Sequence, residues 1–401
     1  MGQSLNQLPP STTHLLRKAD LLVAGERIQA AWPDFSGRRM MIKAPLNQLL
    51  DELAREIHAG SNIVVLVGGD PCFYGIGPLL VRRLGHENVR LHPGTTTLQA
   101  VAAQLGVSWE DIPTVSLHGR DRIELLFTAL ARNTKVAVYS DERRTPAILA
   151  AMLLERGAEN FRMLVFENLG MEGERAGTYS LDQARSLAFS ALNLVILERV
   201  RAPEVVLTLG MAESAYVHEH GLITKRVVRS AALAALALEP DNLLWDLGAG
   251  CGSVGIEAGL LLPLGGVVAV ERDERRAAMI RENIRRTNAF WVRVVHGLMP
   301  KCLEALPEPD RIFLGGGLGG EQEGGKDVLE TTWDRLKPGG SLVAAVVLLE
   351  SLHRAKSFLE RHGLELEISQ IQAGHSVPLA SDLRFSTQNP VFLLSSRKPL
   401  P

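Results

Sequence analysis

The 401-residue sequence has few cysteines, little net charge and no long apolar run, and each shortage argues against a class of protein. Its three cysteines, Cys72, Cys251 and Cys302, lie far apart, which argues against a disulfide framework and a cysteine zinc site. The formal net charge of −2 gives no electrostatic case for general binding to nucleic acid or a membrane surface. No apolar stretch reaches membrane-span length and the N-terminus lacks a signal pattern, so we expect a cytoplasmic protein.

Apolar residues, by contrast, are plentiful. They make up 46% of the chain, enough for full hydrophobic cores. The length predicts two or three domains. A stretch with a proline, a glycine and no clear period, near residues 203–220, is the expected linker. We therefore expect one domain over residues 1–202 and another over residues 221–401.

The strongest pattern is an apolar run over residues 243–247 that contains Asp246 and leads into alternating glycines over residues 248–252. A helical pattern follows, and then a second apolar run, over residues 266–270, that leads into Glu271. Strand, glycine turn, helix, strand and acid form the start of a doubly wound sheet that binds nucleotides. Glycines let the backbone turn tightly and approach a ligand. An acid at the end of the second strand can accept both ribose hydroxyl hydrogens.

The spacing of these glycines differs from the dinucleotide fingerprint, because Ser253 stands where the third glycine would be. The segment instead resembles the first motif of Rossmann-type methyltransferases that use S-adenosylmethionine (SAM). That resemblance implies that the loop packs on the methionine part of SAM and that Glu271 takes the ribose. NAD binding and a plain strand-to-helix turn are the alternatives. The loop residues implied in binding are Asp246, Gly248, Ala249, Gly250, Cys251 and Gly252.

A second pattern follows an apolar run over residues 62–67. Gly68-Gly69-Asp70-Pro71-Cys72-Phe73-Tyr74-Gly75 makes a tight loop at a strand's carboxyl end, where open sheets place ligands. Taken alone, Gly69-Asp70-Pro71 is also a common turn. Further along the chain come residues 90–97, expected to be a strand and a loop, then the segments Leu117 to Arg120, Thr145-Pro146, Glu167 to Gly170 and Asn193 to Val195.

This ordered series resembles the tetrapyrrole (corrin and porphyrin) methylase family, and within it the branch that methylates C5 of precorrin-6. The resemblance implies two small α/β lobes with SAM in a cleft between them. The family normally opens with a strand carrying a glycine-proline-glycine loop; residues 1–10 contain none, so we expect that strand to be missing. The SAM contacts implied in this half are Gly69, Asp70, Gly75, Thr95, Thr145 and Pro146.

Just before the glycine turn, Thr224-Lys225-x-x-Val228-Arg229 opens an alanine- and leucine-rich helix. Read alone, the segment is a helix start with Thr224 as N-cap. It also resembles the corresponding helix of the precorrin C15-methylase and decarboxylase family, in which the threonine contacts SAM. The two roles are compatible.

The fourth strand of the second half, expected over residues 311–314, leads into Gly315, Gly316 and Gly317. Amino-group methylases of nucleic acids often carry Asn/Asp-Pro-Pro-Tyr there, whereas glycines leave room for a bulky planar substrate. The fifth strand is expected over residues 341–349. It leads into Glu350, which is either an acid of the site or a solvated helix cap.

Both halves together resemble one bifunctional family that methylates precorrin-6B at C5 and C15. The resemblance implies two methyl transfers from SAM, loss of carbon dioxide from the C12 acetate, no metal, a role in cobalamin biosynthesis and a homo-oligomer. Because the tetrapyrrole carries many carboxylates, cations should clamp it. We expect Arg120, Lys225 and Arg229 to do so, unless they are ordinary surface charges.

Three other interpretations remain open. A nucleic-acid or protein methyltransferase would need a basic face or the Asn/Asp-Pro-Pro-Tyr motif. An NAD(P) oxidoreductase would need the third dinucleotide glycine. The first half could also be a scaffold that presents tetrapyrrole to an active second half.

Overall fold

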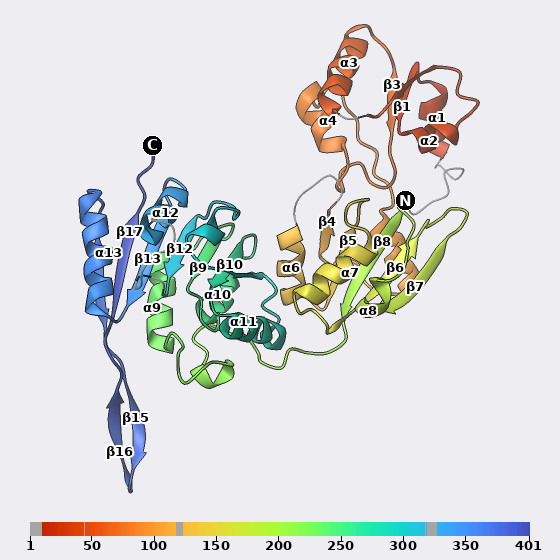
Figure 1. The fold of residues 1–401 in the computed structure, drawn as a ribbon. Coiled ribbons are helices and arrows are strands. Elements are labelled where there is room, and N and C mark those ends of the chain that lie inside the picture. Colours follow the sequence, from red (N-terminus) through yellow and green to blue (C-terminus); the bar gives the residue numbers. More distant parts are fainter. Residues whose placement is uncertain (1–9, 44, 118–122, 317, 319–326) are drawn as a thin grey trace. The chain divides into compact units, whose positions relative to one another are not determined.

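The computed structural model describes residues 10–43, 45–117, 123–316, 318 and 327–401 (Figure 1). The chain divides into two compact units, which we describe separately. The first comprises Met1–Arg120, Lys135–Ile148 and Met163–Leu197. The second comprises Asp121–Thr134, Leu149–Arg162 and Glu198–Pro401. The expected domain boundaries at 202 and 220 stay a prediction. None of the described helices is long and apolar enough to cross a bilayer.

The first unit begins with a parallel sheet of order β2-β1-β3. Its central strand is fully buried, because Leu21 to Ala24 are all apolar and helices pack on both sides. Leu49, Leu50 and Leu53 on one face of α3 enter this core. The elements are α1 (Pro10–Arg17), β1 (Leu21–Ala24), α2 (Glu26–Ala30), β2 (Arg38–Met41), α3 (Leu46–His58), β3 (Ile63–Leu66) and α4 (Gly77–Leu84).

A second sheet has the order β4-β5-β8-β6-β7. Its middle strands are runs of buried apolar residues, as expected for strands covered on both faces. The elements along this stretch are α5 (Thr97–Leu105), β4 (Thr114–Ser116), α6 (Ile123–Arg132), β5 (Lys135–Tyr139), α7 (Pro146–Glu155), β6 (Phe161–Glu167), β7 (Arg175–Ser180), α8 (Leu181–Ala184) and β8 (Asn193–Arg199).

The second unit contains a seven-stranded sheet of order β11-β10-β9-β12-β13-β17-β14 among the described residues. The five strands β11, β10, β9, β12 and β13 are parallel, and β17 runs antiparallel to β13 and β14. The strand order reverses between β9 and β12, the position where open α/β sheets bind ligands. The strands are β9 (Leu243–Leu247), β10 (Gly266–Glu271), β11 (Val292–His296), β12 (Arg311–Leu314), β13 (Ser341–Val346), β14 (Glu367–Ile371) and β17 (Val391–Arg397).

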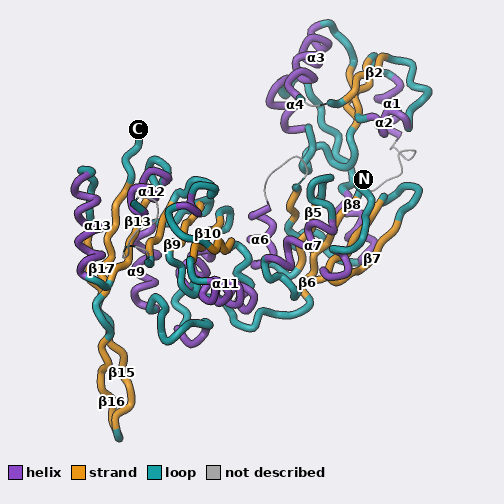
Figure 2. Tube along the Cα trace, in the orientation of Figure 1, coloured by secondary structure: helices purple, strands orange, loops and turns teal. Residues whose placement is uncertain are grey.

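Helices cover this sheet, and a hairpin extends from it. Figure 2 shows the two strands of the hairpin, β15 (Gly374–Leu379) and β16 (Asp382–Thr387), as an arm separate from the sheet. In the chain, the hairpin comes between β14 and β17. The helical elements of the unit are η1 (Glu213–Ala215), α9 (Arg226–Leu236), α10 (Ser253–Ala258), η2 (Gly259–Leu261), α11 (Glu274–Thr287), η3 (Lys301–Leu303), α12 (Val328–Arg335) and α13 (Leu349–Arg361).

Several expectations about elements were wrong. Residues 90–96 form no strand, because a proline and two flanking loops interrupt the run. The expected fifth strand ends at Val346 rather than Leu349, since an exposed pair of residues precedes α13. Strand β2, helix α6 and strand β7 were not anticipated; β7 alternates exposed and half-buried residues at a sheet edge, which gives a weak apolar signal.

Candidate functional site

The glycine turn after β9 is built as the sequence predicts. Gly248, Gly250 and Gly252 all have left-handed backbone, with φ of 67°, 60° and 80°. A Cβ on Gly252 would lie 2.7 Å from Cγ2 of Ile280, whereas a Cβ on Gly250 would meet nothing within 4 Å. Gly252 is therefore required by packing, and Gly250 faces open space at the carboxyl edge of the sheet.

Glu271, at the end of β10, holds this turn. Its Oε2 accepts a hydrogen bond from the Gly250 N–H at 2.9 Å, and its Oε1 accepts one from the Asp273 N–H at 3.0 Å. The side chain is buried, yet each oxygen keeps a free lone pair, because a carboxylate offers about four acceptor positions. Glu271 can therefore accept further hydrogen bonds from a ligand.

Asp246 lies beneath the same turn on the central strand β9. Its Oδ2 accepts from the Gly255 N–H at 2.9 Å, while its buried Oδ1 has no hydrogen-bond partner among the described residues. Burial away from water raises the pKa of Asp246 to about 7, against the lowering effect of the Gly255 N–H. An orphaned buried oxygen of this kind is suited to a ligand that donates hydrogen bonds or carries positive charge.

The glycines after β12 meet the turn. A Cβ on Gly248 would lie 2.9 Å from the Gly316 backbone, and the Gly315 N–H donates to the Leu247 carbonyl at 2.9 Å. The structure thus brings together two glycine segments that are distant in sequence. Gly317 lies outside the described residues.

The remaining residues of the turn have structural partners. Ala249 donates its N–H to the Val270 carbonyl, as Gly248 does. The carbonyl of Cys251 accepts from Asn283 Nδ2 at 3.0 Å, and burial raises the pKa of the Cys251 thiol. The backbone of this turn is therefore held by hydrogen bonds to strand β10 and helix α11.

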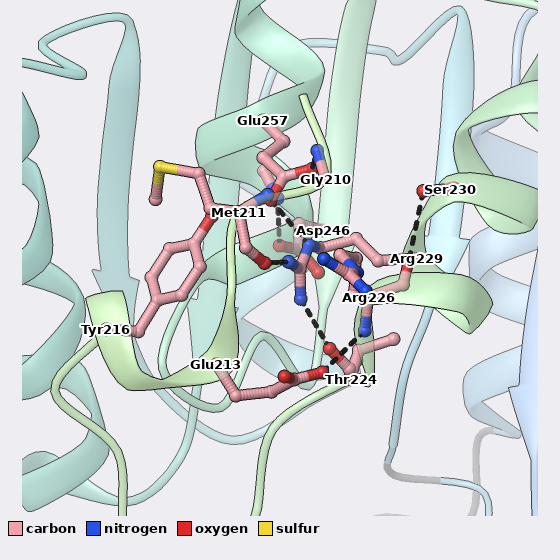
Figure 3. A network of polar contacts seen from close by, with 11 residues as sticks. Gly210, Met211, Glu213, Tyr216, Thr224, Arg226, Arg229, Ser230, Asp246 and Glu257 are labelled. Atoms are coloured by element: carbon pink, nitrogen blue, oxygen red, sulfur yellow. Dashed lines mark hydrogen bonds and ion pairs between the residues drawn. The ribbon is translucent and has the colours of Figure 1, made fainter. Parts of the chain in front are cut away.

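A buried ion pair lies beside the turn (Figure 3). Arg229 Nε donates to Glu257 Oε1 at 2.7 Å, and both side chains are 0% exposed. Glu257 was not anticipated, although one acid within the otherwise apolar helix α10 is the signal that marks it. The expectation that Arg229 clamps substrate is wrong, because its guanidinium is enclosed and its N–H groups are used within the protein.

Thr224 and Lys225 lie where α9 begins, but Thr224 is not the N-cap. Lys225 occupies the cap position without a side-chain cap bond, and Glu213 Oε1 accepts from the Arg226 N–H at 2.7 Å instead. The carboxylate of Glu213, 13 residues before Arg226, thus caps α9 in place of Thr224, the residue that the sequence pattern predicted as N-cap. Lys225 Nζ donates to the Gly221 carbonyl at 3.0 Å.

Two other expected site residues are less well placed. Glu350 is exposed in the first turn of α13, beyond the end of β13, which matches the alternative of a solvated residue at a helix start. Arg120 lies outside the described residues. Within the described ranges, no group of three or more histidine, cysteine, aspartate or glutamate side chains could hold a metal ion.

In the first unit, the loop after β3 is tightly folded. Gly69 has a φ of 76°, and a Cβ on Gly94 would lie 2.6 Å from the Gly69 carbonyl oxygen. Asp70 Oδ1 accepts from the Cys72 N–H at 2.7 Å. A Cβ on Gly75 would lie 2.4 Å from the Pro71 carbonyl oxygen. Two segments, around Gly69 and around Gly94, therefore run in close contact.

Residues next to these segments add polar and aromatic groups. Thr95 directly precedes Thr96, which forms a capping box with Gln99 at the start of α5. Thr145 Oγ1 accepts from the Ile148 N–H at 3.4 Å, and Pro146 opens α7. An aromatic group that was not anticipated lies in the same unit, formed by Phe73, Tyr74 and Tyr139 with ring centroids 4.9–6.2 Å apart.

The geometry of the second unit fits SAM. Gly250 leaves space for close approach, Asp246 Oδ1 offers an acceptor for an ammonium group, and Glu271 offers acceptors for hydroxyls. Asp246 and Glu271 lie on the neighbouring parallel strands β9 and β10, and Gly250 lies in the turn after β9. The donor and acceptor chemistry therefore matches a ligand with a cationic amino acid part and a ribose.

Comparison with known families divides the chain in two. Residues 4–185 match the tetrapyrrole (corrin/porphyrin) methylases, and residues 214–398 match the precorrin methyltransferase domain. Members of these families use SAM as methyl donor. Each half therefore matches a methyltransferase family of its own.

Two curated relatives match most of the chain, and a third matches less than half of it. A Sinorhizobium precorrin-6Y C(5,15)-methyltransferase [decarboxylating] is 34% identical over 83% of this chain and 79% of the relative. The Mycobacterium tuberculosis protein of the same name is 32% identical over 94% of this chain and 92% of the relative. A shorter relative, the Salmonella typhimurium cobalt-precorrin-7 C(5)-methyltransferase, is 39% identical over 42% of this chain and 81% of its own length. The chain belongs to the family of decarboxylating precorrin-6Y C5,15-methyltransferases.

Proposed function

We propose that the two halves divide the reaction, with the tetrapyrrole methylase half methylating C5 and the Rossmann half methylating C15 and releasing carbon dioxide from the C12 acetate. The observation that carries this division is the match of each half to a different methyltransferase family within one chain. The half-length relative named for C5 methylation alone supports it, because that step then needs no second domain in that protein.

In the Rossmann half, we assign SAM to the glycine turn. Gly250 lets the methionine part approach the backbone, and Asp246 Oδ1 accepts from its amino group. Glu271 takes the ribose hydroxyls with its free lone pairs. Other residues that we assign to the walls of this SAM site are Thr224, Gly248, Ala249, Cys251, Gly252, Gly315 and Gly316.

SAM supplies a methyl group already activated by its sulfonium charge. The chain's own task is then mainly to hold SAM and the ring carbon in line at a near-attack distance. The glycines after β12 let that segment pack closely against the turn, and we assign the flat substrate to this edge of the sheet. Decarboxylation requires that the acetate lose its water shell when the substrate binds. We assign Lys225 to a substrate carboxylate in the Rossmann half and, by family resemblance, Arg120 to a substrate carboxylate in the tetrapyrrole methylase half. Glu350 is kept as a candidate acid of the Rossmann site.

In the first half, we assign a second SAM to the loops around Gly69 and Gly94. Thr95 follows Gly94 in the chain, and its carbonyl oxygen lies 3.8 Å from where a Cβ on Gly69 would stand. Asp70 and Gly75 are held within the first loop by contacts with Cys72 and Pro71. Thr145 and Pro146, at the start of α7, complete the proposed contacts. From the family resemblance we also propose a cytoplasmic location and a homo-oligomer; sedimentation of the purified chain would test the oligomeric state.

Product analysis tests the proposed division. Incubation of the full chain with precorrin-6B and SAM is expected to add two methyl groups and release one carbon dioxide per substrate, as measured by mass spectrometry and carbon dioxide trapping. A product with one added methyl group and no lost carboxyl would contradict the assignment of the Rossmann half.

Two neighbouring glycines provide a matched pair of variants. Gly250→Ala is expected to reduce SAM affinity in the Rossmann half about tenfold or more, because a methyl group would enter open space where SAM approaches. Gly252→Ala is expected to cost about 2–3 kcal/mol of unfolding free energy, since its Cβ would overlap Ile280. Calorimetric SAM titration and thermal unfolding of both variants measure the two effects. Equal effects of the two variants on SAM affinity would overturn the assignment of Gly250.

A further inference from the structure

The buried pair Arg229–Glu257 joins three pieces of the second unit, namely α9, α10 and the segment before α9. Glu257 Oε2 accepts from the Gly210 N–H at 2.7 Å, and its Oε1 accepts from the Met211 N–H and the Tyr216 hydroxyl. Arg229 Nη1 donates to the Thr224 carbonyl at 2.6 Å. Figure 3 shows Arg229 of α9 and Glu257 of α10, with these groups reaching the pair from the segment before α9.

Stability alone is a weak reason for such a pair. Removing two charges from water costs several kcal/mol per ion, and well-packed apolar residues in their place are often at least as stable. Here the cost is offset because every polar group of the pair has partners within the segment and the two helices. What apolar residues would not supply is a fixed geometry between those pieces.

One of the pieces that the pair joins, helix α10, directly follows the glycine turn of the proposed SAM site. Glu257 lies in α10, which starts at Ser253 directly after the glycine turn. Arg229 fixes the backbone of Thr224, whose half-buried hydroxyl has no hydrogen-bond partner within the described part of the chain. The backbone is therefore held while the hydroxyl is left available to a ligand.

Resting on the proposed function, we infer that Arg229 and Glu257 are positioning residues that set SAM affinity in the Rossmann half by holding Thr224 against the glycine turn. The guanidinium fork matters, because it bonds Glu257, Thr224 and Met211 at once. A lysine ammonium is a compact charge on a flexible stem and cannot reproduce that fork.

A double-mutant cycle in the full chain tests this inference. Arg229→Lys is expected to raise the SAM KM for carbon dioxide release about tenfold and to leave kcat within about twofold. Thr224→Val is expected to raise the KM by a similar factor. The double variant R229K/T224V should be no worse than T224V alone, because Arg229 acts through Thr224.

Arg311→Lys is the matched control. Arg311 is also buried and also donates to backbone carbonyls, those of Ala237 and Asp310, but it lies at the amino end of β12. The R311K substitution should lower the melting temperature, as R229K does, and leave the SAM KM unchanged. If R229K does not fold, Glu257→Gln, which preserves shape and some acceptors, takes its place in the same cycle with the same expected pattern.

The outcomes separate the inference from the proposed function. Glu271→Gln serves as the reference for the SAM site itself. If E271Q leaves the SAM KM unchanged, the proposed site is wrong. If E271Q raises the KM while R229K and R311K behave alike, or if the R229K and T224V effects simply add, the positioning role is wrong and the site assignment stands.

Discussion

The Glu271→Gln chain is expected to add one methyl group to precorrin-6B instead of two and to release no carbon dioxide. Glu271 is the acid at the end of β10 that holds the Gly250 N–H and keeps lone pairs free for the ribose. A glutamine has the same shape but no charge and one acceptor fewer. Because hydrogen bonds to charged groups contribute about 1.5–3 kcal/mol each, SAM affinity in the Rossmann half should fall roughly 10- to 150-fold.

Mass spectrometry of the product and trapping of carbon dioxide measure this result at a SAM concentration that saturates the unchanged chain. Glu274→Gln is the control, because Glu274 is an exposed acid three residues further on, paired with Arg281 and His296. It should leave both methyl transfers intact. Unchanged carbon dioxide release by E271Q would contradict the role of Glu271.

Asp246→Asn is expected to change how stability depends on pH. The folded-state pKa of Asp246 is raised to about 7 by burial, whereas an aspartate in an unfolded chain titrates near 4. Between these values the folded protein keeps the proton and the unfolded chain releases it. The free energy of unfolding contributed by this group therefore falls as pH rises from about 4 to about 7, by up to about 1.4 kcal/mol per pH unit, and is constant above that range.

An asparagine has no such titration, and its side-chain oxygen can still accept from the Gly255 N–H. Relative to the unchanged chain, D246N should therefore gain stability as pH rises to 7 and stay level above it. Urea unfolding of both chains without SAM at pH 5, 6, 7 and 8 measures the difference. The comparison cancels other acids, such as Glu56, whose pKa is lowered to about 2 by its hydrogen bond from Arg38. A difference that is the same at every pH would show that Asp246 is ionised in the folded protein.

The glycine turn and its two acids could be predicted because their signal is local. Asp246, the glycines and Glu271 lie within one strand-turn-helix-strand unit, where chain spacing fixes spatial position. The same holds for the loop at Gly69 to Gly75 and for most buried strands, which are continuous apolar runs. The ordering of the parallel strands follows from such alternation of strands and helices.

The role of Arg229 could not be predicted, because it depends on contacts distant in the chain. Arg229 and Glu257 are 28 residues apart, and the burial of both is set by how α9 and α10 pack. In sequence, Arg229 looks like one more cation beside Lys225. The cap of α9 could not be predicted for the same reason. Glu213 accepts from the Arg226 N–H, 13 residues further along the chain, whereas the local pattern indicated Thr224 as the cap.

The first half was predicted by resemblance more than by pattern. Its short strands and polar loops give weak periodicity, and β7 and α6 were missed for that reason. The ordered motifs nevertheless identified the methylase family that residues 4–185 match. Local spacing thus predicts compact motifs well, and family likeness is needed where function depends on distant loops.

Calorimetric titration of the full chain with SAM tests the central claim most directly, which is that each half holds its own methyl donor. We predict two SAM molecules per chain, and one for the E271Q chain. One molecule per unchanged chain, lost in E271Q, would leave the first half as a scaffold that presents the tetrapyrrole. Unchanged stoichiometry and affinity in E271Q would contradict the site at the glycine turn and with it the proposed division of the reaction.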